Sequence, residues 1–150
     1  PIQLLLAHLL FCFTISIVSM LLLLGVLIIF FHFSYLGNWL QFIPAYLLVM
    51  ISIHAIGLIV ASLSPSEKAT GAINSAIFFP MFFLSGATVP YEIMPKGLQK
   101  VADIMPLTQG IKLLKAITFR EESGILYMVL LLTAIFIIGI FIAVRYFRWE

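Results

Sequence analysis

Long hydrophobic runs separated by short polar stretches form the main pattern of this chain. No Asp, Glu, Lys or Arg occurs between Pro1 and Ser66. Because about 20 apolar residues suffice to cross the hydrocarbon core of a bilayer, this block can hold two spans. Two further runs flank a segment that contains charged residues. The pattern predicts an all-α integral membrane fold in a single transmembrane domain, with spans at about residues 4–31, 39–63, 69–87 and 125–144.

Turn and cap residues mark the ends of the predicted spans. Gly37 and Asn38 form the turn between the first two spans, and Ser66 or Pro65 can begin the third helix. Pro80 should kink that helix, because proline removes a backbone hydrogen bond. The last span follows a charged turn at residues 120–124. It should end in an interfacial anchor formed by Arg145, Tyr146, Arg148 and Trp149.

The segment at about 91–119 differs from the spans because it is charged. Its central window holds Lys100, Asp103, Lys112 and Lys115. Each charge costs up to roughly 2.5–3.5 kcal/mol at a helix centre, against roughly 0.3–0.6 gained per Leu or Ile, so the sum opposes another crossing. Pro95 and Pro106 divide the segment into two short helices, at about 96–105 and 107–118. We expect a re-entrant or interfacial amphipathic hairpin before the last span.

Each short helix has an apolar and a polar side. On the first, the apolar side comprises Leu98, Val101 and Met105, and the polar side Lys96, Lys100 and Asp103. On the second, the apolar side comprises Ile111, Leu114 and Ile117, and the polar side Thr108, Lys112 and Lys115. Helices of this kind lie in the membrane interface or dip into it packed against protein.

Small residues four positions apart recur in the predicted spans. This spacing lets two helix backbones approach closely in lipid, so it predicts sites of helix packing. The pairs are Gly57 with Ala61, Gly71 with Ser75, and Gly139 with Ala143.

Two polar features inside the spans are candidates for function. His54 lies deep in the second span, where an ionisable group can carry protons or bind a ligand, although a neutral His can equally bond a neighbouring helix. The third span carries a stripe at i, i+4, i+8 and i+11 spacing, which places its members near one face. Such a stripe suits a path for an amphipathic solute, and ordinary bundle packing is the alternative. Its members are Asn74, Phe78, Phe82 and Ser85.

Composition excludes several classes of protein. The chain is 63% hydrophobic and 9% charged, and its net charge of +2 does not indicate a nucleic-acid partner. The single Cys12 excludes an internal disulfide and a multi-cysteine metal site. No phosphate loop, zinc-binding helix or nucleophile elbow occurs, and no pair of carboxylates lies within a predicted span. We therefore expect no enzyme activity and no bound cofactor or metal, and any transport must be energised by a partner.

Residues 78–117 contain a set of short motifs. F-F-P-M-F-F-L-S-G-A-T-V-P is followed by P-x-x-L-Q at Pro95, Leu98 and Gln99 and by P-L-T at Pro106, Leu107 and Thr108. Together they resemble the permease subunits of ABC-2 type transporters, in which the second and third motifs belong to an external helical hairpin. The resemblance implies the C-terminal part of such a permease, with the last four of six spans. It also implies that two further spans and a cytoplasmic coupling helix precede these residues.

The resemblance carries further expectations about mechanism and location. It implies an exporter in the cell membrane, plasma or inner, that works as a homo- or heterodimer of permeases. A separate or fused ATP-binding subunit would hold ATP and magnesium. The end of the third span would narrow the outer exit, which assigns an outer gate to Phe82, Phe83 and Leu84. The hairpin would be external and the C-terminus cytoplasmic.

Charge alone favours the opposite orientation. With the C-terminus inside, the cytoplasmic basic residues are Lys68, Arg145 and Arg148, fewer than those of the hairpin and the turn after it. The rule can be overridden by spans upstream. Orientation from the residues therefore stays open.

Three functions compete at this point. The leading hypothesis is the permease part of an ATP-driven exporter that forms the solute pathway. The rival is a membrane structural or assembly subunit that docks a partner protein through its small-residue faces and hairpin. A secondary carrier that uses His54 is the third, and nothing in the residues identifies a substrate.

Overall fold

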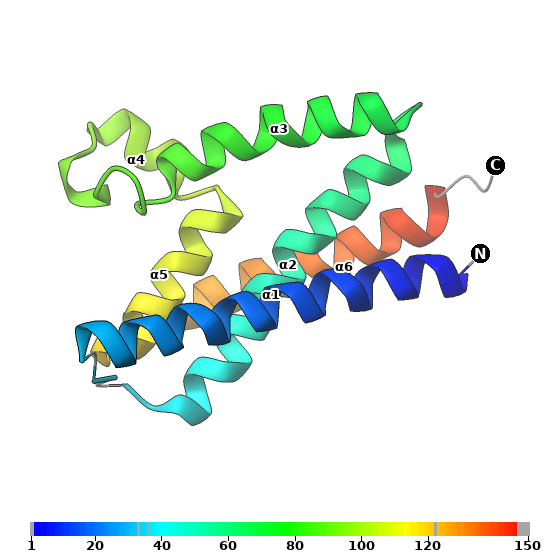
Figure 1. The fold of residues 1–150 in the computed structure, drawn as a ribbon. Coiled ribbons are helices and arrows are strands. Elements are labelled where there is room, and N and C mark those ends of the chain that lie inside the picture. Colours follow the sequence, from blue (N-terminus) through cyan, green and yellow to red (C-terminus); the bar gives the residue numbers. More distant parts are fainter. Residues whose placement is uncertain (1, 33, 36, 122, 147–150) are drawn as a thin grey trace. The chain divides into compact units, whose positions relative to one another are not determined.

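The computed structural model describes residues 2–32, 34–35, 37–121 and 123–146, and these are almost entirely helical (Figure 1). The all-α prediction is confirmed for this part of the chain. The elements in order are α1 (Ile2–Phe31), α2 (Trp39–Leu63), α3 (Glu67–Leu84), the short 3-10 helix η1 (Tyr91–Ile93), α4 (Lys96–Ala102), α5 (Pro106–Phe119) and α6 (Ile125–Tyr146).

Three of these helices are long and apolar enough to cross a membrane. They comprise Leu9–Phe31 of α1, the whole of α2 and the whole of α6. The remaining predicted span, the third along the chain, corresponds to α3, which ends at Leu84 rather than near residue 87. At about 1.5 Å per residue, α3 is about 27 Å long, slightly less than the roughly 30 Å of the hydrocarbon core. A fourth crossing therefore stays a prediction.

Local chemistry explains where the helices begin and end. Asn38 caps α2 by accepting a hydrogen bond from the backbone N–H of Leu40 at 2.9 Å. Ser66 caps α3 by accepting one from Ala69 at 3.2 Å, as the sequence predicted. Pro80 lies inside α3, which runs through it unbroken, and the predicted kink stays untested. Of the predicted turn and anchor residues, Glu122, Arg148 and Trp149 lie outside the described residues.

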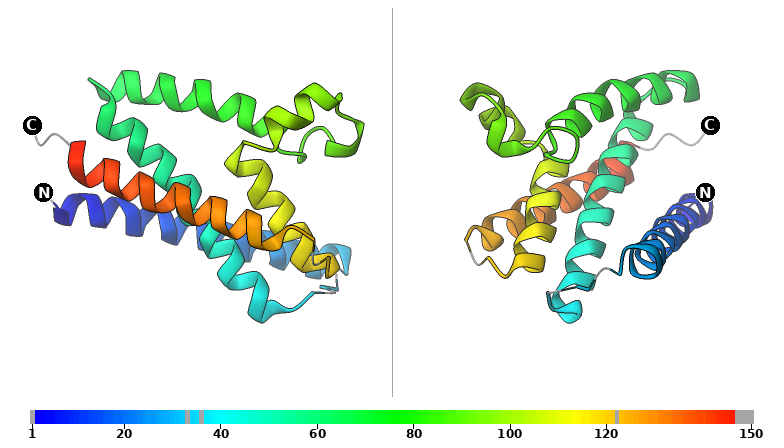
Figure 2. Two further views of the ribbon diagram at one scale, coloured as in Figure 1. Left: turned by 180° about the vertical axis from the view of Figure 1, so that it is seen from behind. Right: turned by 60° about the vertical axis from the view of Figure 1, so that its left-hand side comes forward.

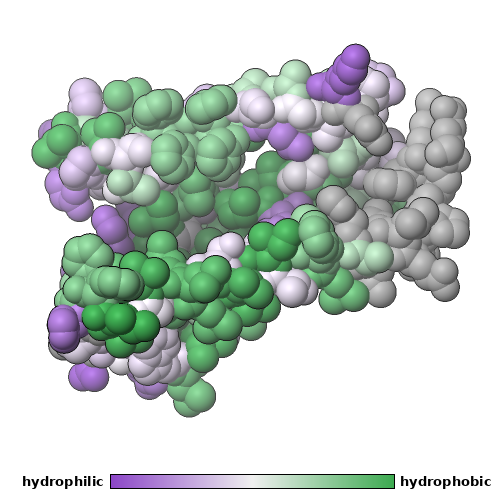
Figure 3. All heavy atoms as spheres, viewed as in Figure 1, coloured by the Kyte–Doolittle hydropathy of each residue, from purple (hydrophilic) through white to green (hydrophobic). Residues whose placement is uncertain are grey.

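The chain divides into two compact units. The first consists of α1 with the following residues up to Leu36, and the second contains α2 to α6. The surface seen in Figure 3 is mostly hydrophobic (green), and hydrophilic residues (purple) form small separate groups, several of them near the edges of the view. Such a surface is suited to contact with lipid.

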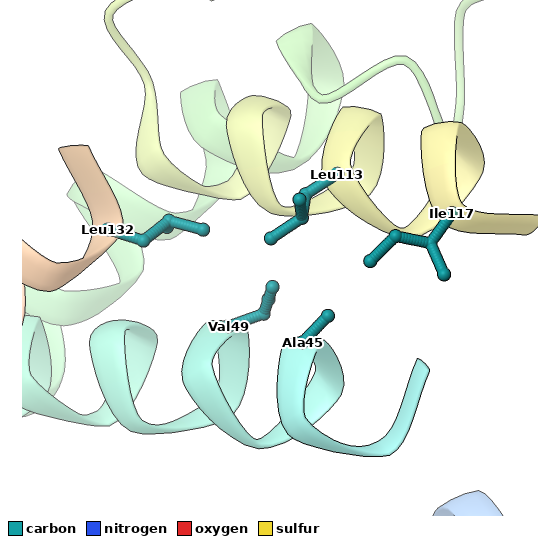
Figure 4. Close-up of a cluster of buried hydrophobic side chains, with 5 residues drawn as sticks. All are labelled: Ala45, Val49, Leu113, Ile117 and Leu132. Atoms are coloured by element: carbon teal, nitrogen blue, oxygen red, sulfur yellow. The ribbon is translucent and has the colours of Figure 1, made fainter. Parts of the chain in front are cut away.

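The second unit is built around α2, α5 and α6, which contact one another and lie close together in both views of Figure 2. Leu113 of α5 and Leu132 of α6 are both 0% exposed and lie between these helices. Figure 4 shows the side chains of this cluster pointing toward one another from the three helices. Its members are Ala45, Val49, Leu113, Ile117 and Leu132.

Small residues bring these helices into close contact. A Cβ added to Gly139 of α6 would lie 2.6 Å from the Cβ of Ala55 and 3.1 Å from its carbonyl oxygen, and a Cβ added to Gly110 of α5 would lie 2.6 Å from Val49 Cγ1. Ala143 is also buried, so the predicted packing role of Gly139 and Ala143 is confirmed. The buried hydroxyl of Ser52 adds a polar link, 2.9 Å from the carbonyl oxygen of Leu132.

The other two small pairs make no close helix contact among the described residues of the second unit. Added Cβ atoms at Gly57 and Gly71 would meet no atom within 4 Å, and Ala61 is exposed. The predicted packing sites on α2 and α3 are therefore wrong for contacts between the helices of this unit. α2 turns a different side, with Ser52 and Ala55, toward its partners.

Candidate functional site

A cleft of about 310 Å³ lies between α2 and α3. Because α3 has its main contacts with α2 and with α4 and α5 of the hairpin, it lies apart from α6 and leaves this space open. Among the described residues, none that carries a charge at neutral pH lines the cleft. Its lining comprises Ile53, Ile56 and Gly57 from α2, and Asn74, Ser75, Ile77, Phe78 and Met81 from α3.

The cleft brings together half of the predicted stripe. Asn74 and Phe78 both line it, whereas Phe82 and Ser85 do not. Phe82 stacks on Phe78 with ring centroids 5.6 Å apart. Ser85 is buried, and its hydroxyl donates to the carbonyl of Phe82 at 2.7 Å while accepting from Ala87 N–H at 3.2 Å. Ser85 is thus the C-cap residue of α3. Contact between the stripe and a solute stays a prediction.

The polar groups of the cleft differ in how they are satisfied. The hydroxyl of Ser75 donates to the carbonyl of Gly71 one turn earlier, at 2.9 Å. The carboxamide of Asn74 makes no side-chain hydrogen bond to any residue that the structure describes. Asn74 is partly buried, among apolar neighbours. Its amide is accessible from the cleft and can therefore bond a partner other than the described residues.

The predicted outer gate lies where α3 meets the hairpin. Phe82 and Phe83 are 38% and 55% exposed, and their rings lie 6.1 Å apart. The carbonyl of Leu84 accepts a hydrogen bond at 3.1 Å from the hydroxyl of Thr108, which is fully buried. The backbone at these positions is thus tied to α5. A gating role for the three residues stays a prediction.

The predicted hairpin is present as two short helices separated by proline. Pro95 is the N-cap residue of α4 and Pro106 is the first residue of α5, where the missing N–H removes no helical hydrogen bond. Leu98 is 45% exposed on α4, whereas Leu107 is partly buried on α5. The division at both prolines is therefore confirmed, and α5 is packed against α2 and α6.

The predicted sidedness of the two helices is wrong in part. On α4 the buried residue is Ala102, while Leu98 and Val101 are both more than 40% exposed. On α5 Thr108 was placed on the polar side, yet it is buried together with Gln109, Gly110, Leu113, Ala116 and Ile117. Small and polar residues face the protein here because lipid does not penalise apolar residues on the outer side. Hydrophobicity alone cannot identify the packed face in that setting.

A polar cluster joins the start of the hairpin to α5. Lys112 Nζ lies 2.6 Å from Asp103 Oδ1 and 3.6 Å from the centre of the Tyr91 ring, and the Tyr91 hydroxyl donates to Asp103 at 2.8 Å. Desolvation alone would raise the pKa of Asp103, but hydrogen bonds from Lys112 and Tyr91 and the charge of Lys112 outweigh it and lower that pKa. Desolvation alone would lower the pKa of Lys112, but hydrogen bonds and electrostatic interactions with Asp103 and Tyr91 outweigh it and raise that pKa.

Two glutamines complete the polar network of the hairpin. Gln99 Nε2 donates to the carbonyl of Tyr91 at 3.1 Å, and Gln109 Nε2 donates to that of Asp103 at 2.6 Å. The carbonyl of Tyr91 also accepts from the N–H of Met94 at 3.2 Å, so Gln99 adds a second donor there. The P-x-x-L-Q and P-L-T motifs thus owe part of their polar character to the architecture of the hairpin.

His54 lies outside the cleft. Its Nδ1 is 2.8 Å from the carbonyl oxygen of Met50, one turn earlier on α2. A proton or ligand role for His54 stays a prediction. Among the described residues, no group of three or more His, Cys, Asp or Glu side chains is placed to hold a metal ion.

The structure adds residues to the site that sequence reasoning missed. Gly57 and Met81 line the cleft, and Tyr91 joins the ion pair. Gly57 was interpreted as a packing residue, and no spacing rule relates it to Asn74 on another helix. The helical position of Met81, between Phe78 and Phe82 on α3, was the one available signal.

Fold and site together define a multi-pass helical membrane protein with a cleft between two of its helices and a folded hairpin. The ABC-2 type transporter family profile matches residues 1–119 of this chain. The chain therefore belongs to the ABC-2 type transporter family.

Named relatives agree with this family. The inner membrane transport permease YhhJ of Escherichia coli (strain K12) is 29% identical over 112 residues, which are 72% of this chain and 30% of that protein. Nodulation protein J of Rhizobium leguminosarum bv. viciae is 28% identical over 81 residues, or 52% of this chain and 31% of that protein. The matched part is therefore less than a third of the length of these relatives. No solved structure matches the chain.

Proposed function

We propose that this chain is the membrane-spanning permease part of an ATP-driven exporter and forms its solute pathway. The match of the ABC-2 family profile to residues 1–119 carries the proposal. The relative from Escherichia coli is named an inner membrane transport permease, and we propose the same membrane for this chain. ATP and magnesium would be bound by an ABC ATP-binding subunit, and a second permease copy would complete the pathway.

The packing of the second unit supports different roles for its helices, with a fixed core and a helix that moves. α2, α5 and α6 share a close-packed core, whereas α3 carries an exposed row of aromatic residues and borders the cleft. A helix with few packing contacts is the one that moves at the lowest cost. In the proposed mechanism, α3 moves relative to the core when the partner subunits hydrolyse ATP, and Asn74, Phe78 and Phe82 contact the solute.

The position of α5 supports a re-entrant hairpin. At about 1.5 Å per residue, Val49 lies about 15 Å along α2 from Trp39, half of the roughly 30 Å hydrocarbon thickness. Gly110 near the start of α5 contacts Val49, and Ile117 near its end joins the cluster that includes Ala45. The C-terminal end of α5 therefore lies nearer than its start to the membrane surface at the Trp39 end of α2. We propose that this surface is external and that the C-terminus is cytoplasmic.

The function can be tested with the complete protein and its ATP-binding partner. The two should co-purify, and candidate solutes should stimulate ATP hydrolysis by the complex but not by the ATP-binding subunit alone. Absence of an ATP-binding partner would contradict the proposal and favour a docking subunit.

The pathway can be tested separately by substitution. Asn74→Leu and Phe78→Ala should lower ATP-dependent efflux at equal expression, because both side chains line the cleft. Leu126→Ala is the matched control, since Leu126 is exposed on α6 and does not line the cleft. Unchanged efflux in both cleft variants would remove these residues from the pathway.

A further inference from the structure

The cleft between α2 and α3 has the size and chemistry of a small-molecule site. Its volume of about 310 Å³ lies at the lower end of the range of roughly 300–1,000 Å³ that is usual for such sites. The aliphatic part of the lining comes from both helices, and the ring of Phe78 stacks against Phe82. These surfaces suit an apolar chain or ring.

Asn74 is the polar group that remains available in this cleft. The hydroxyl of Ser75 is used within α3, whereas the carboxamide of Asn74 bonds no described residue. A carboxamide offers two N–H donors and one carbonyl acceptor. In an apolar setting, leaving these groups unpaired has a substantial cost, so a ligand that supplies a partner is favoured. Because no charged side chain lines the cleft, it offers a charged ligand no compensating partner.

We infer that the cleft binds an uncharged amphipathic molecule with a slender apolar part and one hydroxyl, carbonyl or amide group that hydrogen-bonds Asn74. This inference rests on the proposed function, in which the ligand is the exported solute. The apolar part lies against Ile53, Ile56 and Phe78, and the polar group lies beside Asn74. The site thereby selects uncharged solutes over charged ones.

Two glycines provide a matched test of the cleft. Gly57 lines it and Gly71 does not, yet a Cβ added at either position would meet no atom within 4 Å. Gly57→Leu should therefore fill the cleft without disturbing the helices, while Gly71→Leu adds the same side chain elsewhere. The probe is an octanol that carries a photoreactive diazirine, used on the complete protein with its ATP-binding partner in lipid nanodiscs. Mass spectrometry locates the labelled residues.

The inference predicts adducts on cleft residues of α2 and α3, and competition by plain octanol. Gly57→Leu should lower the yield of these adducts roughly tenfold or more. Gly71→Leu should leave the yield unchanged. Equal labelling in all three proteins would overturn the inference. Absence of adducts from the cleft would also overturn it, because another part of the protein or a second copy then fills this space.

Asn74→Leu tests the polar half of the inference. Loss of one hydrogen bond should weaken competition by octanol roughly three- to tenfold, while Asn74→Gln should retain most of it. Competition that is equally strong in Asn74→Leu would remove Asn74 from the site. ATP-dependent transport is measured with the same protein complex reconstituted into liposomes. Its absence with normal labelling would contradict the proposed function alone, whereas transport without cleft labelling would contradict this inference alone.

Discussion

The two sides of α2 differ in how they meet the rest of the second unit. On one side, Val49, Ser52 and Ala55 lie against α5 and α6, with contacts so close that glycines are needed opposite Val49 and Ala55. On the other side, Ile53, Ile56 and Gly57 border the cleft toward α3. Both sides have similar hydrophobicity, so the difference comes from side-chain size and hydrogen bonding across the contact.

This difference shows that the second unit combines a close-packed core with a less closely packed helix. Close packing of α2, α5 and α6 resists displacement because every shift loses many contacts. The α3 helix has its main contacts with α2, α4 and α5, and the bond from Thr108 to the carbonyl of Leu84 joins its end to α5. Predictions that compare a substitution in the core with one on α3 therefore test the proposed mechanism.

The largest effect is expected from a bulky residue at Gly139. Gly139→Leu would drive a side chain into the backbone of Ala55 and should destabilise the protein by about 3 kcal/mol or more. The same change at Gly71 meets open space and should be nearly neutral. Thermal unfolding in detergent measures both. Equal stability of the two variants would contradict the packing described for α6.

A smaller loss is expected from a cavity in the core. Leu113→Ala should cost about 2–3 kcal/mol, at the lower end for buried leucines because lipid already surrounds the unfolded helices. Phe83→Ala on α3 removes a larger side chain that is 55% exposed, and it should cost less. The same unfolding assay compares them. A greater loss for Phe83→Ala would show that α3 is packed as tightly as α5.

The polar cluster of the hairpin should contribute about 0.5–1 kcal/mol, because Asp103 and Lys112 are 43% and 26% exposed. Lys112→Met should lower the local stability of the hairpin, measured by hydrogen exchange, whereas Lys115→Met should not. The lowered pKa of Asp103 means that its carboxylate stabilises the fold. This contribution should be complete above the ordinary pKa of 3.8 and lost as the pH falls through the lowered value. A loss that begins near neutral pH would contradict it.

The smallest effect is expected at His54. His54→Ala should change ATP-dependent transport by less than roughly twofold, since Nδ1 bonds the carbonyl of Met50 on its own helix and the ring does not line the cleft. Transport rates at two pH values would check this. Loss of transport in the variant would favour the hypothesis of a secondary carrier that uses His54.

Helix positions could be predicted from the sequence because they depend on local signals. Hydrophobic runs predicted α1, α2 and α6 to within a few residues. Pro95 correctly marked the start of α4, and Pro106 marked the start of α5. The end of α3 was placed too late, since the hydroxyl of Ser85 bonds the last turn and Gly86 adopts a positive φ of 83°. That geometry has no hydrophobic signature.

The packed faces could not be predicted in the same way. In water the apolar side of a helix is buried, but in lipid small and polar residues also turn inward, so Thr108 and Gly110 face the core. The predicted free-energy cost of inserting this segment into the membrane also counted Asp103 and Lys112 as separate charges. Their pairing across Pro106 depends on the fold and reduces the cost of bringing the hairpin close to lipid.

The central claim is that solute passes along α3 and not through the core of α2, α5 and α6. After replacement of Cys12, single cysteines would be placed at Asn74 and Phe78, and at Leu113 and Leu132 as core controls. A small hydrophilic thiol reagent is applied to the complete exporter with and without ATP. We predict that the first two cysteines react at rates that change with ATP and that the controls stay unreactive. Cysteines at Asn74 and Phe78 that are as unreactive as the controls in both conditions would contradict the account.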